Sequence, residues 1–340
     1  MEWIEIFLSN RFQTVKVNGS TSYPSPVHNG VPQGSVLGPL LFILYINDLP
    51  ECIESDSYLF ADDTKIFQTI TSKEEADLLQ SDIDSLQLWS DKWLLKFHPD
   101  KCHVLSIGKF EDIAYTKRYQ LGGTELEHVF SEKDLDVIID SELTFEEHIN
   151  AKIQKANIMS GLIRRSFSFL DGKLFKKLYV AFVRPHLEYC QAVWAPYLKK
   201  YINSIENVQR RATKSVDGMN NLDYVERLHR LEIPTLAFRR LRGDMIEMYK
   251  HFHSYDRTSL SQAFRPREEP SRRHNFQLHR NFSKGGYRSA QHNSFYYRSV
   301  KTWNELPKDV GNAESINMFK NKLDELWKNH PLRHNFEALY

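Results

Sequence analysis

The chain is predicted to be an α+β protein in which short antiparallel strands come first and helices follow. Within residues 1–140, short apolar runs with strand-like alternation are separated by turn signals, the clearest of which is Asn18-Gly19. After Asp140 the apolar residues recur at helical spacing instead. The charge balance changes as well, because residues 1–150 carry 11 Lys/Arg and 26 Asp/Glu, whereas residues 151–301 carry 29 and 12.

Strand and turn signals alternate through the first part of the chain. A short helix leads into a strand at 12–17, which turns back at Asn18-Gly19 into a strand at 23–28. Residues 35–47 are apolar almost throughout and predict a buried helix, and 57–70 predict a hairpin.

A helix, and then further strands, are predicted downstream of this hairpin. Ser72 and Glu75 form a capping box, and the helix that they start has one apolar stripe. Residues 94–108 predict a strand, a turn around His98-Pro99-Asp100-Lys101 and a second strand. Residues 119–123 and 135–139 predict another hairpin or paired strands.

Helical periodicity dominates after Asp140. Thr144 and Glu147 predict a second capping box, and Lys152, Lys155, Arg164 and Arg165 fall outside the apolar stripe that follows. Helices are expected over 174–187, 202–216 and 223–251. The polar, basic stretch 254–293 predicts a linker, and 295–326 a last element with a closing helix. Four histidines lack partners at zinc spacing and are expected on the surface: His251, His253, His274 and His279.

Bulk composition describes a globular chain with room for more than one domain. Its 340 residues are 41% hydrophobic, 26% charged and 13% aromatic, which argues against long disorder. Cys52, Cys102 and Cys190 are far apart, so neither a disulfide framework nor a cysteine zinc site is expected. Acidic residues interrupt the N-terminal apolar stretch, and the longest apolar run, Val36–Ile46, is too short to span a bilayer. We therefore expect an intracellular protein without a membrane segment.

The pair Asp62-Asp63 is the strongest candidate for a functional site. It lies between an apolar run that ends at Ala61 and a second strand-like run from Thr64 to Gln68. Two adjacent carboxylates at a hairpin turn place oxygen ligands close together and attract Mg²⁺. An ordinary acidic turn is the alternative, because Asp favours turns through its own backbone hydrogen bonds.

A glycine-rich segment precedes this pair. Residues 29–39 read as a turn that leads into an apolar helix, with Ser35 in position to cap it. Gly30, Gly34 and Gly38 leave room for a base pair or a sugar to approach the backbone. A purely structural turn is again the alternative.

Taken together, these segments resemble motifs B and C of the reverse transcriptases of non-LTR retrotransposons, in the jockey-like and RTE/CR1-like groups. The likeness runs from Val31 through Pro50 and then through Phe60-Ala61-Asp62-Asp63. It continues in segments beyond the palm: 133–140, where the family usually has Gly in place of Asp136, 184–190, 206–212 and 303–307. A positive φ at Asp136 would be strained.

The resemblance implies a Mg²⁺-dependent polymerase that copies RNA into DNA. Nucleotidyl transfer uses two Mg²⁺ ions roughly 3.5–4 Å apart, and the resemblance makes Asp62 and Asp63 catalytic metal ligands. It gives Lys101 the role of acting on the leaving pyrophosphate. It also assigns a nucleotide- and template-binding segment and a primer grip, which are Pro32, Gln33, Gly34 and Ser35, and Leu121, Gly122 and Gly123.

The domains implied are a partial right-hand palm over 1–140, a helical thumb-like region over 141–250, a basic flexible linker over 251–294 and a C-terminal extension over 295–340. Arginines of the thumb-like region are expected to contact nucleic-acid phosphates: Arg210, Arg211, Arg239, Arg240 and Arg242. A solvated basic helical face is the alternative. The partners implied are an RNA template, a DNA primer and dNTPs, with no small-molecule cofactor, and the location implied is the nucleus and cytoplasm, as a ribonucleoprotein.

The motif A aspartate and the fingers of the family have no counterpart in residues 1–340. Because two carboxylates alone do not hold both metal ions in line, we expect this C-terminal part to be inactive by itself. The alternatives are a non-catalytic retrotransposon remnant that binds RNA or a protein partner and, with weaker support, a splicing factor like the group II intron maturases.

Overall fold

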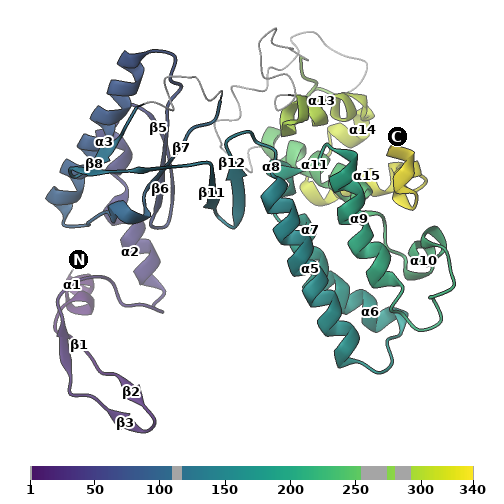
Figure 1. The fold of residues 1–340 in the computed structure, drawn as a ribbon, viewed down its shortest axis with the longest axis horizontal. Coiled ribbons are helices and arrows are strands. Elements are labelled where there is room, and N and C mark those ends of the chain that lie inside the picture. The colour runs from purple at the N-terminus through teal and green to yellow at the C-terminus, as the bar shows by residue number, and fades with distance from the viewer. Residues whose placement is uncertain (1, 109–116, 254–273, 280–291, 340) are drawn as a thin grey trace. The chain divides into compact units, whose positions relative to one another are not determined.

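The computed structural model describes residues 2–108, 117–253, 274–279 and 292–339, which belong to two compact units, 1–129 and 130–340. The first unit is coloured purple to blue in Figure 1 and the second teal to yellow. The secondary structure is mixed α+β, as predicted, and is mostly helical with small sheets. Every sheet among the described residues has two strands, so the broader antiparallel sheet expected of a palm is not present there.

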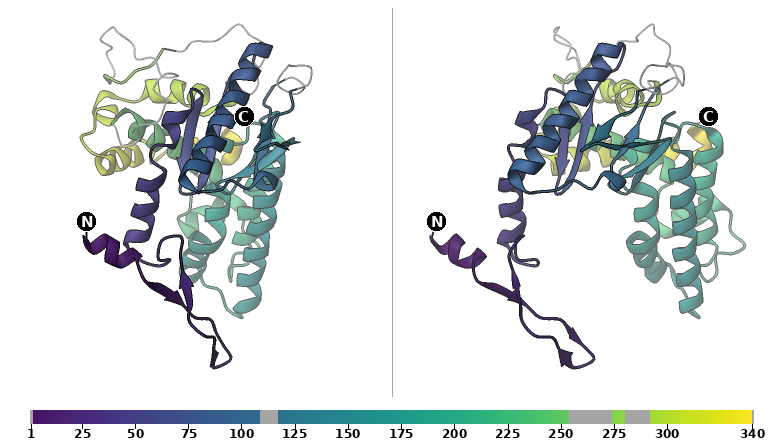
Figure 2. Two further views of the ribbon diagram at one scale, coloured as in Figure 1. Left: turned by 90° about the vertical axis from the view of Figure 1, so that its left-hand side faces the viewer. Right: turned by 60° about the vertical axis from the view of Figure 1, so that its left-hand side comes forward.

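A narrow ribbon follows the first helix, α1 (Glu2–Leu8). Strand β1 (Arg11–Gln13) pairs with β4 (Ser25–Val27), and β2 (Lys16–Val17) pairs with β3 (Ser20–Thr21). Asn18 and Gly19 join the inner strands with φ of 48° and 85°, the two positive values of a type I′ turn. The predicted hairpin is therefore confirmed. In the views of Figure 2 the ribbon projects away from the rest of its unit.

Helix α2 (Leu37–Ile46) forms where predicted, but it is not buried. Leu40, Ile43 and Leu44 are each more than half exposed, at 52%, 54% and 64%. The helix is apolar on all sides, whereas only the face with Phe42 and Ile46 packs against described residues. The prediction of burial was wrong. The apolar composition of the helix indicates that other residues should pack over it, but it does not show whether those residues are present.

The core of this unit lies between a hairpin and a long helix. After the short η1 (Leu49–Cys52), β5 (Asp56–Phe60) pairs with β6 (Asp63–Phe67), and α3 (Lys73–Trp93) packs against the pair. The predicted capping box is confirmed, since Ser72 accepts from the Glu75 amide and the Glu75 side chain accepts from that of Ser72.

The remaining strands of this unit match the prediction in part, because the turn at 99–101 and the strand after it form as predicted. Residues 94–98 form no strand, because Leu94 ends α3 in a left-handed conformation and Pro99 starts η2 (Pro99–Lys101). Strand β7 (His103–Leu105) runs parallel to β10 (Glu127–Val129). Residues 119–123 do not pair with 135–139, since β8 (Gln120–Leu121) pairs with β9 (Thr124–Glu125).

The second unit begins with the hairpin of β11 (Ser131–Asp134) and β12 (Val137–Asp140) and continues as helices. Their bounds are α5 (Glu146–Ser166), α6 (Gly172–Leu178), the π-helical η3 (Tyr179–Val183), α7 (Arg184–Glu188), α8 (Gln191–Trp194), α9 (Lys199–Thr213), α10 (Tyr224–Leu231) and α11 (Leu236–Phe252). Their apolar faces enclose one core that includes Ile149, Phe175 and Trp194.

The predicted capping box at the start of α5 is wrong. The amides of Thr144 and Phe145 donate to the carboxylate of Asp140, at 2.9 and 2.6 Å. The Glu147 side chain instead accepts a hydrogen bond from Ser131. Lys152 is also not on an outer face, because it is only 7% exposed. Asp140 thus orders the turn that precedes α5. The Thr144 hydroxyl accepts from the Glu146 amide, at 3.3 Å, and not from that of Glu147 as the capping box requires.

Helices α13 (Phe295–Glu305), α14 (Lys308–Gly311) and α15 (Ile316–Leu326) pack with the C-terminal part of α11 around Trp303. The chain closes with η5 (Pro331–Arg333) and η6 (Phe336–Leu339). Much of the predicted linker lies outside the described residues, but its described part, 274–279, is packed, with His274 and Leu278 almost fully buried. A surface position for His274 is therefore wrong, since its Nε2 lies 2.8 Å from the Trp303 carbonyl oxygen.

Two bulk expectations can be compared with the described residues. Cys52, Cys102 and Cys190 are free thiols. None of the described helices has both the length and the apolar character that a membrane span requires.

Candidate functional site

The acidic pair lies at the tip of the β5–β6 hairpin. Phe60 pairs with Asp63, so Ala61 and Asp62 are the two turn residues. Ala61 has φ 53° while Asp62 keeps a negative φ, which is the pattern of a type II′ turn. An alanine in this left-handed region costs about 1–3 kcal/mol, and such strain is often retained at functional sites. The carboxylates of Asp62 and Asp63 are both exposed.

The strands beneath this turn are anchored to the core of the unit. Leu59 and Ile66 pack against the cluster that contains Leu86 and Trp89. On the outer face the rings of Tyr58 and Phe67 meet edge-on, with centroids 5.4 Å apart. The two carboxylates therefore project from a fixed base.

The donor set at the turn suits a hard cation but is incomplete by itself. Carboxylate oxygens are the ligands that Mg²⁺ prefers in proteins. In the described part of the chain, no three His, Cys, Asp or Glu side chains come together as a metal-binding group. Asp62 and Asp63 fit one end of a Mg²⁺ site, and a complete two-metal site requires at least one further carboxylate.

The glycine-rich segment forms a compact turn before α2. The Ser35 hydroxyl donates to the Pro32 carbonyl at 2.7 Å and accepts from the Gly38 amide at 2.9 Å, so Ser35 caps the helix as expected. Gly34 has φ 76°, and a β carbon there would meet no atom within 4 Å. Gln33, next to it, is also exposed.

Gly38 has a different role from the one predicted. It is buried, and a β carbon there would lie 2.8 Å from the Pro32 carbonyl oxygen. Gly38 therefore permits close packing within the protein and does not open the backbone to a ligand. Arg11, which the sequence did not single out, donates to the carbonyl oxygens of Leu8 and Gly30 at 2.8 and 2.5 Å. No local pattern signals that link.

Two further predicted positions lie elsewhere in the first unit. Lys101 is exposed at the end of η2, and among the described residues no hydrogen bond or ion pair joins it to Asp62 or Asp63. Gly122 and Gly123 form the β8–β9 turn, with φ of 58° and 80°. Leu121 is buried, and a β carbon at Gly122 would meet Gln87 Oε1 at 2.9 Å, so only the Gly123 side of this turn is open.

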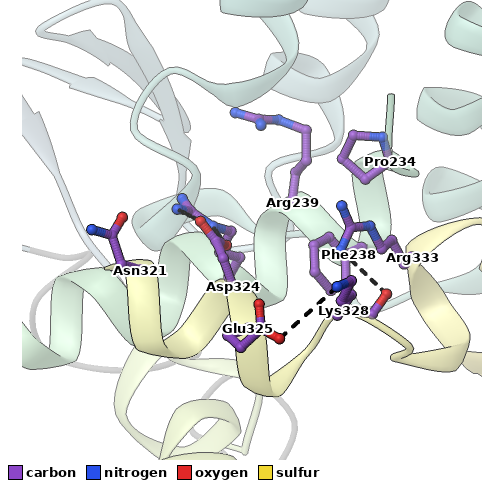
Figure 3. A pocket seen from close by; sticks show the side chains of 9 residues that line it. Pro234, Phe238, Arg239, Asn321, Asp324, Glu325, Lys328 and Arg333 are labelled. Atoms are coloured by element: carbon purple, nitrogen blue, oxygen red, sulfur yellow. Dashed lines mark hydrogen bonds and ion pairs between the residues drawn. The ribbon is translucent and has the colours of Figure 1, made fainter. Parts of the chain in front are cut away.

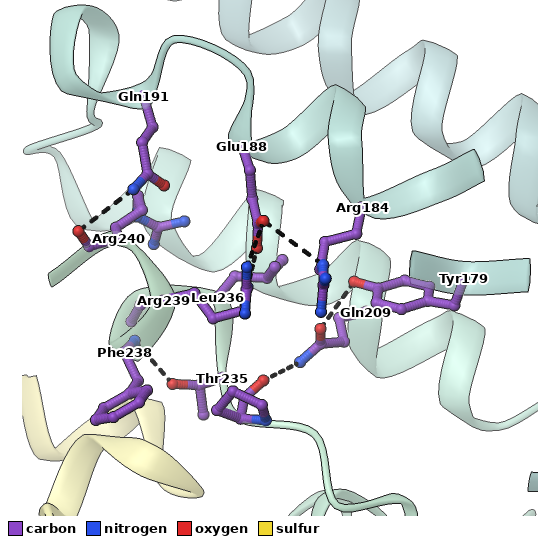
Figure 4. Close-up of polar contacts among 12 residues, drawn as sticks. Tyr179, Arg184, Glu188, Gln191, Gln209, Thr235, Leu236, Phe238, Arg239 and Arg240 are labelled. Carbon is purple, nitrogen blue, oxygen red and sulfur yellow. Dashed lines mark hydrogen bonds and ion pairs between the residues drawn. The ribbon is translucent and has the colours of Figure 1, made fainter. Parts of the chain in front are cut away.

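Each of the five arginines predicted to contact phosphates has partners inside its own unit. Arg239 forms a two-point ion pair with Glu188, which also lies 3.5 Å from Arg184 (Figure 4). Arg242 pairs with Asp324 at 2.6 and 2.7 Å. Arg240 is 7% exposed, and its charge opposes the rise that burial causes in the pKa of Glu206 and Asp244.

Arg210 and Arg211 are similarly engaged. The Arg210 guanidinium lies over the rings of Tyr224 and Phe336, at 5.1 and 4.9 Å. Arg211 donates to the Asn207 carbonyl oxygen and to Asn157 Oδ1, both at 3.3 Å. These contacts give all five arginines a structural role beside any contact with nucleic acid.

The segment 206–212 holds a buried polar network. Glu206 is fully buried and accepts from the amides of Leu236 and Ala237 at the start of α11 and from the Tyr224 hydroxyl. Burial raises the pKa of Glu206, although these donors oppose the change. Gln209 accepts from the Tyr179 hydroxyl (Figure 4) and donates to the Tyr224 hydroxyl and the Pro234 carbonyl oxygen.

The β11–β12 turn has the strain that its sequence predicts. Leu135 and Asp136 have φ of 42° and 65°. The Asp136 carboxylate pairs with the ammonium groups of Lys152 and Lys133, and these hydrogen bonds lower its pKa to about 2. Nearby, burial lowers the pKa of His148 to about 4, and the Ile138 amide donates to its Nδ1 at 3.1 Å.

Helix α5 also presents an exposed stripe, of which the sequence indicated only the basic residues. Lys155, Ile158, Leu162 and Arg165 recur every three or four residues and lie on one side of the helix. Ile158 and Leu162 are 54% and 43% exposed. Phe182, on the adjoining η3, is also half exposed. Basic and apolar side chains thus share one outer face, here called the α5 stripe.

Comparisons with known proteins find similarity to reverse transcriptases. Residues 1–158 match the family model described as reverse transcriptase (RNA-dependent DNA polymerase). Curated relatives include the RNA-directed DNA polymerases from mobile element jockey of Drosophila funebris and Drosophila melanogaster, each 30% identical, and a probable RNA-directed DNA polymerase from transposon BS of Drosophila melanogaster, 29% identical. Each alignment covers 63% of this chain and 25% of the relative, so the chain spans about a quarter of their length. No solved structure matches the chain.

Proposed function

We propose that this chain, which is related through residues 1–158 to the reverse transcriptases and at about 30% identity to those of jockey-like non-LTR elements, supplies palm and thumb-like parts of an RNA-directed DNA polymerase. The observation that carries the proposal is the strained turn at Ala61. It presents Asp62 and Asp63 together from a hairpin that is anchored in the core. Strain at an exposed acidic turn has no structural benefit that the described residues reveal.

In this proposal Asp62 and Asp63 hold Mg²⁺. When bound, the metal would activate the primer hydroxyl and neutralise the triphosphate of the incoming dNTP. Gln33 and Gly34 lie exposed before α2, where they are available to a nucleotide or a template base. The open side of the Gly122-Gly123 turn is assigned to the primer strand, and Lys101 to the leaving pyrophosphate.

The remaining carboxylate is proposed to come from a segment of the same polypeptide outside residues 1–340. Two facts support this. The relatives are about four times as long as the part that aligns with this chain, and α2 leaves a large apolar surface uncovered among the described residues. We accordingly propose that residues 1–340 alone do not support processive DNA synthesis.

The α5 stripe is the proposed face for the template–primer duplex. Lys155 and Arg165 can contact phosphates on either side of Ile158 and Leu162, and apolar side chains can pack against sugars and base edges in a minor groove. This proposal moves the main phosphate contacts from the five arginines to the stripe. Palm, thumb-like region, linker and extension keep their proposed limits, 1–140, 141–250, 251–294 and 295–340.

A localised metal-binding measurement tests the acidic turn directly. Mn²⁺ added to isotope-labelled residues 1–340 is expected to broaden the NMR signals of residues around Asp62 and Asp63 first. The double variant Asp62→Asn/Asp63→Asn should lose this broadening, while Asp56→Asn, at the other end of β5 and also exposed, should keep it. Broadening that is equal in all three proteins would contradict a metal site at the turn.

A non-catalytic remnant that binds RNA is the second candidate. It is favoured by the exposed Lys155 and Arg165 of the α5 stripe, which can contact phosphates without a metal ion. Its test is an RNA-binding titration at several salt concentrations with Lys155→Ala/Arg165→Ala. Loss of affinity in this variant, together with Mn²⁺ broadening that ignores Asp62 and Asp63, would favour the remnant.

A further inference from the structure

A pocket of about 540 Å³ opens on the second unit between α11, α15 and η5 (Figure 3). Four of its lining residues are basic and two are acidic: Arg239, Arg242, Lys328 and Arg333, and Asp324 and Glu325. Phe238 and Pro234 add an apolar part to the wall. The volume is within the range of ligand pockets, about 300–1,000 Å³.

The two acidic side chains of the pocket already pair with basic side chains, one closely and one weakly. Asp324 receives both hydrogen bonds of the Arg242 guanidinium, at 2.6 and 2.7 Å, so this pair is internally neutral. Glu325 is 4.0 Å from the Lys328 ammonium, which is the limit of an ion pair, and both side chains are largely exposed. Lys328 is therefore only weakly neutralised.

The other two basic side chains also leave positive charge uncompensated. Arg239 shares the single carboxylate of Glu188 with Arg184 (Figure 4). Burial, and then the charge of Arg239, lowers the pKa of Arg184, as expected where two guanidinium groups share one anion. Arg333 donates to the Lys328 carbonyl at 3.2 Å and has no carboxylate partner in the part of the chain that the structure describes.

We propose that this pocket binds a phosphoryl group, with Arg333 and Lys328 as its direct contacts and Arg239 contributing long-range attraction. Planar guanidinium groups suit phosphate oxygens, and a lysine ammonium adds a point charge. The same chemistry is offered by a phosphodiester of single-stranded nucleic acid and by a free nucleotide. The proposal goes beyond the polymerase function, because its residues are separate from Asp62 and Asp63 and need no metal.

The test uses the full chain with EDTA present, so that metal-dependent binding at the acidic turn does not contribute. The probes are a fluorescent single-stranded RNA 12-mer of mixed sequence and a fluorescent dATP analogue. Arg333→Ala and Lys328→Ala are each expected to weaken binding of one probe by about fivefold. Lys301→Ala, which removes an exposed lysine on α13, is the matched control and should leave binding unchanged.

Glu325→Gln supplies a readout of opposite sign. It removes the carboxylate that competes for Lys328, so affinity should rise, an effect that loss of folding cannot produce. Weaker RNA binding alone identifies a phosphodiester as the ligand, and weaker binding of the dATP analogue alone identifies a free nucleotide. If neither probe distinguishes the three pocket variants from wild type, or if Lys301→Ala weakens binding as much as they do, the proposal is overturned.

Discussion

Replacing Asp136 by Asn should weaken the contact between the β11–β12 hairpin and α5. The substitution preserves the shape of the side chain, and Asn tolerates the left-handed backbone that Asp136 adopts at φ 65°. The change therefore removes charge and leaves the turn intact. Lys152, only 7% exposed, then loses its anionic partner and keeps a buried ammonium group.

The size of the effect follows from the pKa of Asp136. A decrease from 3.8 to about 2 corresponds to at most about 2.4 kcal/mol, at 1.36 kcal/mol for each pKa unit. The carboxylate is 49% exposed, so solvent screening reduces this to about 1 kcal/mol. Because the folded pKa is the lower one, the stabilisation is present above pH 4 and is lost as the pH falls toward 2.

Hydrogen exchange of the β11–β12 amides measures the local loss of stability. These amides include that of Ile138, which donates to His148. A decrease of about 1 kcal/mol in the free energy of opening lowers their protection factors about fivefold at pH 7. The difference between variant and wild type should shrink as the pH falls from 4 to 2, where about half of the folded wild-type molecules still carry an ionised Asp136, and should disappear only below pH 2. Equal protection at pH 7, or a difference that persists unchanged at pH 2, would refute the assigned ion pair.

Three further predictions concern packing and titration. Gly38→Ala should destabilise the start of α2 by about 1–3 kcal/mol, since its β carbon would meet the Pro32 carbonyl oxygen at 2.8 Å. Chemical denaturation of the variant tests this, and an unchanged midpoint would contradict the packing. Glu206→Ala should lower the free energy of unfolding by about 3 kcal/mol or more, because buried amides and the Tyr224 hydroxyl lose their acceptor. Thermal melting of the second unit measures this, and a decrease below about 1 kcal/mol would argue against the network. Because the pKa of His148 is about 4, below its usual 6.5, the free energy of unfolding should fall as the pH drops from 6.5 to 4. His148→Gln should reduce this dependence of stability on pH, and an unaltered dependence would show that other groups cause it.

Local signals in the sequence predicted local structure well. Asn18-Gly19 forms its turn and Ser72 with Glu75 forms its capping box because each depends on residues a few positions apart. The strain at Asp136 was also predictable, since the backbone of that turn requires a positive φ. Its compensation by Lys152 was not, because 16 residues separate the partners.

Long-range partners account for what the sequence did not reveal. Arg239 and Arg242 were predicted to contact phosphates, yet each pairs with a carboxylate of the protein, 51 and 82 positions away in the sequence. The apolar pattern of α2 likewise predicted burial without indicating what would cover it. At the candidate site, Asp62 and Asp63 were predicted from residue type, neighbours and family resemblance, whereas the left-handed Ala61 and the exposure of Ile158 and Leu162 in the α5 stripe are apparent only in the structure.

The central claim is that Asp62 and Asp63 form the metal-binding end of a polymerase site. Its most direct test is RNA-templated primer extension with Mg²⁺ by a polypeptide that joins residues 1–340 to the segment proposed to supply the remaining carboxylate. Extension should be lost in Asp62→Asn and in Asp63→Asn and retained in Asp56→Asn. Primer extension that continues unchanged when both Asp62 and Asp63 are replaced would contradict the claim.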